Sequence, residues 1–331
     1  MGAAWDELPS YLRLGTDELA ARARRALTLL GQERCGVCPR LCKVDRLADH
    51  RGLCAIGRQA VVASFFAHFG EENCLRGWNG SGTIFFSGCN LRCVFCQNYQ
   101  ISQEFQEGYP RTLTAEELAC EMLRLQDQGA HNINFVSPSH VILQMADAVR
   151  MAKSRGLVIP VVYNSNGYDS VDALRLIGGL VDIYLPDLKY MENGLAKQFS
   201  AARDYAGIVP AVLREMLEQV GHLQINRDGI ATRGLLVRHL VLPNQVANSR
   251  KCLRFLADLS PDIFVSIMSQ YSPQYKAGSY PSLNRKLTQA EYDAVTEYAL
   301  DLGLENAFIQ ELESQEHYVP DFEQDSPFNV A

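Results

Sequence analysis

The feature that most constrains the fold is an alternation that begins near residue 82, where short β-branched or aromatic runs are followed by amphipathic segments of helical length. The strand-like runs are GTIFFS, HNINFVS, LVIPVVYNS, VDIYLPDLK, GLLVRHLVLP and DIFVSIMSQY. Six strand–helix units can be counted, and the last ends with TQAEYDAVTEYALDLG. Because such alternation implies right-handed crossovers, it predicts a parallel sheet with helices outside it, as an open or closed α/β barrel.

The size and composition of the chain indicate the class of protein. Its 331 residues suffice for one large domain or two. A hydrophobic content of 47% and a net charge of −7 are ordinary for a globular protein and give no indication of nucleic-acid binding. We find no run of about 18 apolar residues and no basic-then-apolar N-terminus, so we expect no membrane contact and a cytoplasmic location. There, ten cysteines are more often metal ligands or catalytic groups than disulfides.

Composition along the chain suggests four segments. They are an N-terminal helical extension (1–30), a cysteine-rich metal-binding segment (31–78), the barrel (79–305) and a C-terminal tail (306–331). The second segment packs four cysteines into twenty residues among glycine, proline and many charges. Such a composition builds a poor hydrophobic core, so we expect this segment to need a metal in order to fold.

Polar residues stand at the ends of the predicted strands, where α/β folds gather their reactive groups. The candidates are Ser137, Asn164, Asn166, Asp187, Lys189, Arg238 and His239. Asp187 and Lys189 are two residues apart, so their side chains point to the same side of the strand and favour a shared site. The alternatives are a surface ion pair for these two residues and ordinary turn or cap roles for the asparagines.

Two groups of cysteines have metal-ligand spacing. Cys89, Cys93 and Cys96 lie on the loop that leaves the first barrel strand, and soft thiolates favour zinc or an iron–sulfur cluster. Such sites normally have four protein ligands, so either a fourth comes from elsewhere, as in a zinc knuckle, or one metal position is open.

The second group is a complete four-thiolate set, formed by Cys35, Cys38, Cys42 and Cys54. It suits a structural zinc or an auxiliary iron–sulfur cluster, and its spacing does not separate the two. If both groups are purely structural, the protein is a non-catalytic zinc or iron–sulfur binding scaffold.

The CxxxCxxC loop, with Phe95 before its last cysteine, resembles the motif of radical S-adenosylmethionine (SAM) enzymes. Over roughly residues 35–300 the chain is similar to the branch of pyruvate formate-lyase activating enzymes. The similarity is carried by sequence stretches such as SGCNLRCVFCQNYQIS, VVYNSNGYDS and DIYLPDLKY. The resemblance implies a partial (β/α)6 barrel and a [4Fe-4S] cluster on Cys89, Cys93 and Cys96. The fourth iron would be chelated by the amino and carboxylate groups of SAM.

The implied activity is that of an oxidoreductase that cleaves SAM reductively to a 5′-deoxyadenosyl radical, which takes hydrogen from a substrate. The substrate is an unidentified protein or small molecule, with a glycyl-radical enzyme as one candidate. The expected partner is an electron donor such as flavodoxin or ferredoxin.

The resemblance also assigns roles to the strand-end residues. Ser137 stands where a glycine-rich turn contacts the amino group of the cofactor, and Asn164 and Asn166 would hold its ribose or carboxylate. Asp187 and Lys189 correspond to the DLK motif, in which the lysine reaches the cofactor or substrate and is a candidate catalytic residue. Arg238 and His239 resemble the polar pair on the fifth strand and complete the predicted cofactor-binding set.

Overall fold

The strands of the protein form one twisted sheet. The computed structural model describes residues 8–31, 35–105, 111–312, 319–322, 324, 327 and 328. The parallel strands within these residues are β2 (Ser81–Phe86), β4 (Ile133–Val136), β5 (Val161–Asn164), β6 (Ile183–Tyr184), β8 (Ala231–Leu240), β9 (Phe264–Met268) and β10 (Ala307–Ile309). They lie in the order β10-β9-β8-β6-β5-β4-β2, and the edge at β2 is extended by two antiparallel strands.

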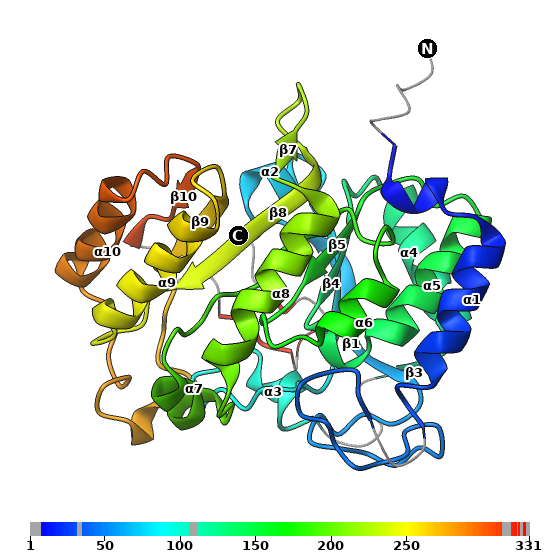
Figure 1. The fold of residues 1–331 in the computed structure, drawn as a ribbon, viewed down its shortest axis with the longest axis horizontal. Helices are drawn as coiled ribbons and strands as arrows, with labels where there is room; N and C mark the ends of the chain where they lie inside the picture. The colour runs from blue at the N-terminus through cyan, green and yellow to red at the C-terminus, as the bar shows by residue number, and fades with distance from the viewer. Residues whose placement is uncertain are drawn as a thin grey trace.

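Helices connect the parallel strands and cover the outside of the sheet (Figure 1). The helices are α1 (Thr16–Leu27), α2 (Asn73–Arg76), α3 (Tyr99–Ser102), α4 (Ala115–Asp127), α5 (Ile142–Ser154), α6 (Val171–Leu176), α7 (Asn193–Ser200), α8 (Tyr205–Val220), α9 (Val246–Leu259) and α10 (Gln289–Asp301). Two of them begin with a reciprocal capping box, Thr114 with Glu117 in α4 and Thr288 with Glu291 in α10. The six strand–helix units and the predicted partial (β/α)6 barrel are confirmed.

The antiparallel strands are β1 (Ala60–His68), β3 (Arg111–Leu113) and β7 (Gln224–Ile225), which pairs with β8. β1 belongs to the predicted cysteine-rich segment and β10 to the predicted tail, yet both are hydrogen-bonded into the central sheet. The predicted boundaries at 78/79 and 305/306 therefore divide a single sheet. The apolar run AVVASFFAH pairs with β2, which satisfies its backbone hydrogen bonds and partly or fully buries its side chains.

The inside of the barrel is closed at one end by apolar side chains. Because β1 is antiparallel to β2 and His68 lies opposite Ser81, the chain that follows β1 enters at the N-terminal ends of the parallel strands. The apolar plug there consists of Cys74, Leu75, Val162, Ile183, Leu185, Leu223, Ala231 and Leu236. A cavity is consequently left toward the C-terminal ends of the strands.

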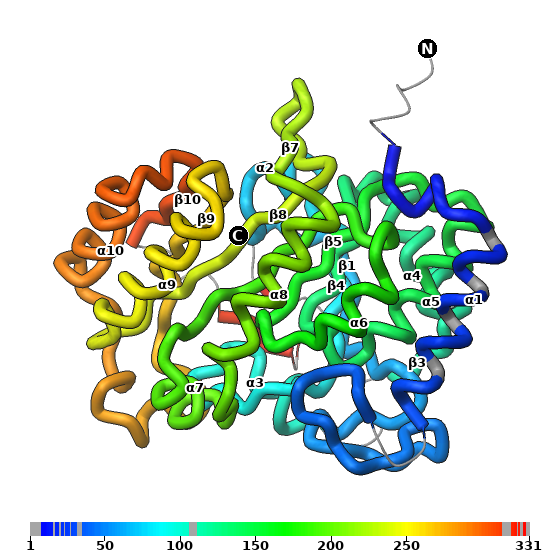
Figure 2. Tube along the Cα trace, viewed as in Figure 1, coloured from blue at the N-terminus to red at the C-terminus, as the bar shows by residue number. Residues whose placement is uncertain are grey.

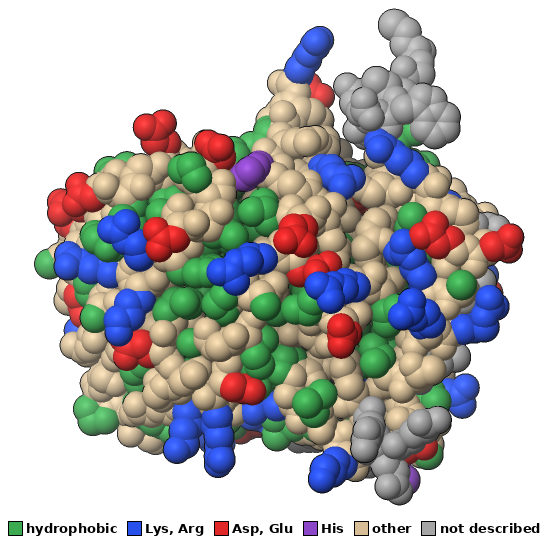
Figure 3. Space-filling model, viewed as in Figure 1, with side chains coloured by type: hydrophobic (Ala, Val, Ile, Leu, Met, Phe, Trp, Pro, Cys, Tyr) green, Lys and Arg blue, Asp and Glu red, His purple; other side chains and the backbone are tan. Residues whose placement is uncertain are grey.

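The N-terminal extension and the cysteine-rich segment lie at different places on the barrel (Figure 2). Near the N-terminus, Ser10 donates its backbone N–H to Asp182 at 2.5 Å, which ties the extension to the start of β6. The cysteine-rich segment lies at the same end as α3 and α7. Lys and Arg side chains are interspersed with Asp and Glu over the face shown in Figure 3. Within the described ranges, no helix has the length and apolar character that a membrane span requires.

Candidate functional site

The cavity at the C-terminal ends of the strands has a volume of about 550 Å³. It brings together the three loop cysteines and six of the seven strand-end candidates. The predicted residues that line it are Cys89, Cys93, Cys96, Ser137, Asn164, Asn166, Asp187, Lys189 and Arg238. Residues separated by about 150 positions in the sequence therefore share one space.

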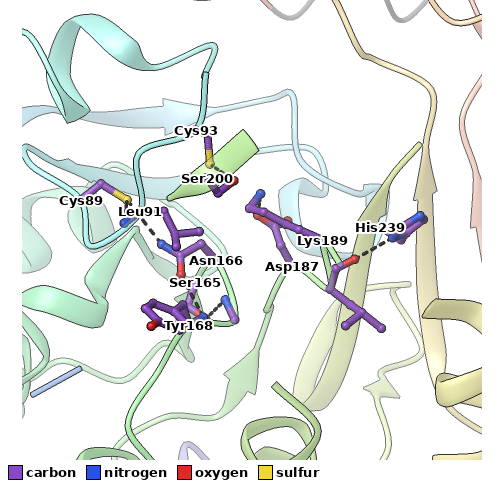
Figure 4. A network of polar contacts seen from close by, with 12 residues as sticks. Cys89, Leu91, Cys93, Ser165, Asn166, Tyr168, Asp187, Lys189, Ser200 and His239 are labelled. Atoms are coloured by element: carbon purple, nitrogen blue, oxygen red, sulfur yellow. Dashed lines mark hydrogen bonds and ion pairs between the residues drawn. The ribbon is translucent and has the colours of Figure 1, made fainter. Parts of the chain in front are cut away.

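Each of the three loop thiols has a polar neighbour, and Figure 4 shows those of Cys89 and Cys93. Cys89 Sγ accepts from the Asn166 side-chain amide at 3.4 Å. Cys93 Sγ lies 3.0 Å from Ser200 Oγ, and Cys96 Sγ lies 3.3 Å from Ser102 Oγ. Donors of this kind orient metal-bound thiolates and tune their basicity.

Burial dominates the acid–base behaviour of these cysteines. It raises the pKa of Cys89 to about 11 and that of Cys96 to about 12, and the thiols reinforce this effect on one another. Burial also raises the pKa of Cys93, although the nearby Lys189 ammonium opposes the rise. Without a metal the thiols are therefore protonated near neutral pH, and metal binding must displace their protons.

Asp187 and Lys189 form an ion pair inside the cavity, with 2.6 Å between Lys189 Nζ and Asp187 Oδ2. Burial alone lowers the pKa of Lys189, but the charge of Asp187 and its hydrogen bond to the ammonium outweigh it and keep this pKa above its usual value. The Tyr205 hydroxyl lies 2.8 Å from the Asp187 carbonyl and 2.9 Å from that of Asn166, and it accepts from the Lys189 backbone N–H at 3.1 Å. One buried tyrosine thus holds the ends of β5 and β6 together.

The backbone turns after β4 and β5 approach the site closely. Gly167 has φ +75°, and a Cβ atom there would lie 2.3 Å from the Asp187 carbonyl oxygen, so only glycine fits. Ser137, at the position expected for a glycine-rich turn, has φ 58° and ψ 48°. Its backbone therefore takes the left-handed conformation that glycine favours, although the residue is serine.

Arg238 and His239 do not act as a pair. Adjacent residues of a strand point to opposite faces, so only Arg238 faces the cavity. His239 is buried on the other face, between the Leu188 carbonyl at 2.6 Å from Nδ1 and Ser249 Oγ at 2.9 Å from Nε2 (Figure 4). Burial lowers its pKa to about 4. The structure thus places this predicted cofactor-binding residue in a packing position outside the cavity.

Glu71 and Glu72 also line the cavity, and sequence reasoning missed them. Both contact the guanidinium of Arg238. They follow the end of β1 by a few residues. The only feature of the sequence that could have identified them is a pair of acidic residues after an apolar run. That run is assigned to the predicted cysteine-rich segment, so its pairing with the barrel sheet is not expected from the sequence.

The second cysteine set lies outside the lining of this cavity. The thiol of Cys38 interacts electrostatically with those of Cys35, Cys42 and Cys54, and burial raises its pKa to about 12. Arg46 is fully buried beside the set and donates to the Gly57 carbonyl at 2.9 Å and the His140 carbonyl at 2.6 Å.

Several contacts join this second set to the three-cysteine loop. Arg40 Nε donates to the Asn90 carbonyl at 2.7 Å, and Arg92 bridges the carbonyls of Cys89 and Leu53. Gly88 has φ +76°, and a Cβ atom there would lie 2.3 Å from the Cys54 carbonyl oxygen. The two cysteine groups are therefore parts of one packed region.

Comparisons with known proteins agree with this geometry. The family model described as the radical SAM superfamily matches residues 83–212, which include the three-cysteine loop. An uncharacterized protein of Methanocaldococcus jannaschii is 33% identical over 280 residues, covering 82% of this chain and 76% of the relative. The pyruvate formate-lyase-activating enzyme of Clostridium pasteurianum is 24% identical over 188 residues, covering 54% of this chain and 69% of that protein.

Proposed function

The chain belongs to the radical SAM superfamily and is an enzyme of the radical SAM type, and from this premise we propose that it cleaves SAM reductively and abstracts hydrogen from a substrate. Membership of the family implies a [4Fe-4S] cluster and SAM. When bound, this pair supplies the 5′-deoxyadenosyl radical that attacks a C–H bond. The substrate and its partner proteins belong to the proposal.

The donor set fits the implied cluster. The observation that carries the proposal is that three thiols of one loop face a cavity of about 550 Å³ whose walls carry a buried ion pair and amide groups. No group of three or more His, Cys, Asp and Glu side chains in the described ranges is arranged to hold a single metal ion. A cluster instead spreads its thiolates over several irons, which suits Cys89, Cys93 and Cys96.

The remaining cavity residues would bind and orient SAM. Asn166 hydrogen-bonds to Cys89 and lies beside the Asp187–Lys189 pair, so we assign this part of the wall to the charged methionine end of SAM. We assign Asn164 to the ribose and the left-handed turn at Ser137 to the amino group. Lys189 keeps its ammonium charge and would hold a carboxylate.

The loop that follows β9 closes over the cysteine loop and would exclude water. Lys276 donates its backbone N–H to the Val94 carbonyl at 2.8 Å, and the Gln97 side chain donates to the Gln270 carbonyl at 3.1 Å. Tyr275 stacks on Tyr99 with ring centroids 5.0 Å apart. A site covered in this way would protect a reactive intermediate from side reactions.

The second cysteine set is part of the proposal as a second metal centre, in which an iron–sulfur cluster or zinc would draw the four thiols together, because the described side chains are not arranged around a single ion. Its thiols are near enough to interact electrostatically, which supports a shared metal, and its contacts with the three-cysteine loop support a role close to the chemistry. A one-electron donor such as flavodoxin or ferredoxin would supply the electron for SAM cleavage. The similarity to a pyruvate formate-lyase-activating enzyme supports a glycyl-radical protein as a narrower candidate substrate.

Anaerobic reconstitution with iron and sulfide tests the proposal. The reconstituted protein should become brown and, with dithionite and SAM, form 5′-deoxyadenosine. Cys93→Ala should abolish this product, whereas Cys120→Ala, at an exposed position on α4, should leave it unchanged. A protein that binds only zinc and forms no deoxyadenosine would instead be the non-catalytic scaffold.

A further inference from the structure

The inner end of the cavity, between the apolar plug and the loop cysteines, carries a compact charged group. Arg238 Nε donates to Glu72 Oε1 at 2.8 Å, and its Nη2 contacts carboxylate oxygens of both Glu71 and Glu72. The side chain of Asn134 donates to Glu71 Oε1 at 2.9 Å. We call Glu71, Glu72, Arg238, Asn134 and the neighbouring His68 the acidic floor.

The charges of the floor do not balance. Two carboxylates share one guanidinium, and the side chains of Glu71 and Glu72 are each only 7% exposed. Burial raises the pKa of Glu72, but the charge of Arg238 outweighs this effect and keeps the pKa below its usual value. The other charged pair that lines the cavity, Asp187 with Lys189, is neutral as a whole. An uncompensated buried carboxylate is costly, so the floor favours a cation.

Two buried polar atoms of the floor also lack partners. Asn134 is fully buried, and its Oδ1 has no hydrogen-bond partner among the described residues. His68 lines the cavity, is 7% exposed, and its Nδ1 is likewise unpartnered within the described part of the chain. Burial lowers the pKa of His68, so the ring is neutral near pH 7. Because buried polar groups are normally paired, the unpartnered Nδ1 of His68, which lines the cavity, points to a ligand there, whereas Asn134 contacts Glu71 but is not itself part of the cavity lining.

We propose that the acidic floor binds a cationic nitrogen group of the substrate, a guanidinium or an ammonium, with Glu71 as its main counter-charge. The proposal rests on the proposed function only in taking this cavity as the place where the substrate binds. Arg238 lies beside Asp187 through a β-bridge, so the floor is next to the Asp187–Lys189 pair. A substrate held at its cationic end would therefore extend toward the loop cysteines.

Matched probes test the proposal on the reconstituted full chain in the presence of SAM. n-Butylguanidinium, its neutral isostere n-butylurea and the anion pentanoate would be titrated by calorimetry. We expect the guanidinium to bind at least tenfold more tightly than the urea, and pentanoate to bind most weakly. Glu71→Gln should weaken guanidinium binding about tenfold and leave urea binding unchanged. Glu297→Gln, at an exposed position on α10, is the matched control.

Equal binding of the three probes, or full guanidinium affinity in Glu71→Gln, would overturn the proposal. If Glu71→Gln does not fold, Glu72→Gln removes the same excess charge, and the probe series on the unchanged protein already decides the charge preference. Deoxyadenosine formation without probes is measured separately. If the unchanged, reconstituted protein forms no deoxyadenosine, the proposed function is contradicted. If it forms deoxyadenosine normally but does not discriminate among the three probes, only the acidic floor as a cation site is contradicted.

Discussion

Single residues around the cavity, outside its lining, are held by contacts that leave little room for substitution. Gly167 is an example, because its left-handed backbone and its closeness to the Asp187 carbonyl act together. His239 is another, since both ring nitrogens are committed to hydrogen bonds behind the site. Two predictions belong to this scale.

Gly167→Ala should lower the free energy of unfolding by about 2 kcal/mol or more, because alanine resists positive φ and its Cβ would displace the Asp187 carbonyl. Urea unfolding measures the loss, and deoxyadenosine formation should fall with it. Gly207→Ala is the control, since it lies in α8 with open space around its Cα and should stabilise the protein by about 0.5 kcal/mol. Equal effects of the two substitutions would contradict this account.

The burial of His239 predicts a loss of stability in acid. Its folded pKa, about 4, lies below the ordinary value of 6.5, so the unfolded state binds more protons between these values. The contribution of neutral His239 to the free energy of unfolding is therefore fully present above pH 6.5. It decreases as the pH falls from 6.5 toward 4, and at pH 5.5 the decrease is roughly 1 kcal/mol. Urea unfolding at pH 7.5 and 5.5 should show a smaller decrease for His239→Gln than for the unchanged protein. An identical decrease in both would show that this histidine is not responsible.

At the scale of elements, the cysteine-rich segment and the barrel meet through a few buried polar contacts. Arg46 is fully buried and donates to carbonyls of its own segment and of the turn after β4. A segment with few apolar side chains depends on such contacts for order, and the proposed metal would add to them.

Arg46→Met should loosen this segment, because two buried carbonyls lose their donor at a cost of about 2 kcal/mol. Limited trypsin digestion, followed by mass spectrometry, should show faster cleavage after Lys43. Arg150→Met, on the outer helix α5, should leave the rate unchanged. Resistance equal to that of the unchanged protein would mean that the segment is held without Arg46.

At the scale of the whole molecule, the two cysteine groups are close but separate in their expected roles. The three-cysteine loop faces the cavity, whereas the four-cysteine set lies outside the cavity lining. Contacts such as Arg92, which bridges Cys89 and Leu53, connect the two regions.

Cys38→Ala should therefore retain some uncoupled SAM cleavage, whereas Cys93→Ala should show none. Iron content and deoxyadenosine formation after anaerobic reconstitution measure the difference. Equal loss of product in the two variants would show that the division of roles between the cysteine groups is wrong.

The sequence by itself determined the barrel, because strand and helix periodicities are local properties of the chain and six units repeat in order. The sequence also indicated most of the site. The C-terminal ends of parallel strands meet at one edge of the sheet, and Asp187 and Lys189, which are two residues apart, point to the same side and form an ion pair there. The same parity separates Arg238 from His239, because adjacent residues of a strand point to opposite faces. The position of His239 outside the cavity lining therefore follows from a local property of the strand.

Only the tertiary structure decided the long-range pairings. β1 joined the sheet through antiparallel hydrogen bonds, which no local pattern specifies, and it brought Glu71 and Glu72 under Arg238. Likewise, Tyr205 reached the ends of two strands from a helix that follows them. Contacts between residues far apart in the chain depend on how whole elements pack, and that packing made the inner end of the cavity acidic.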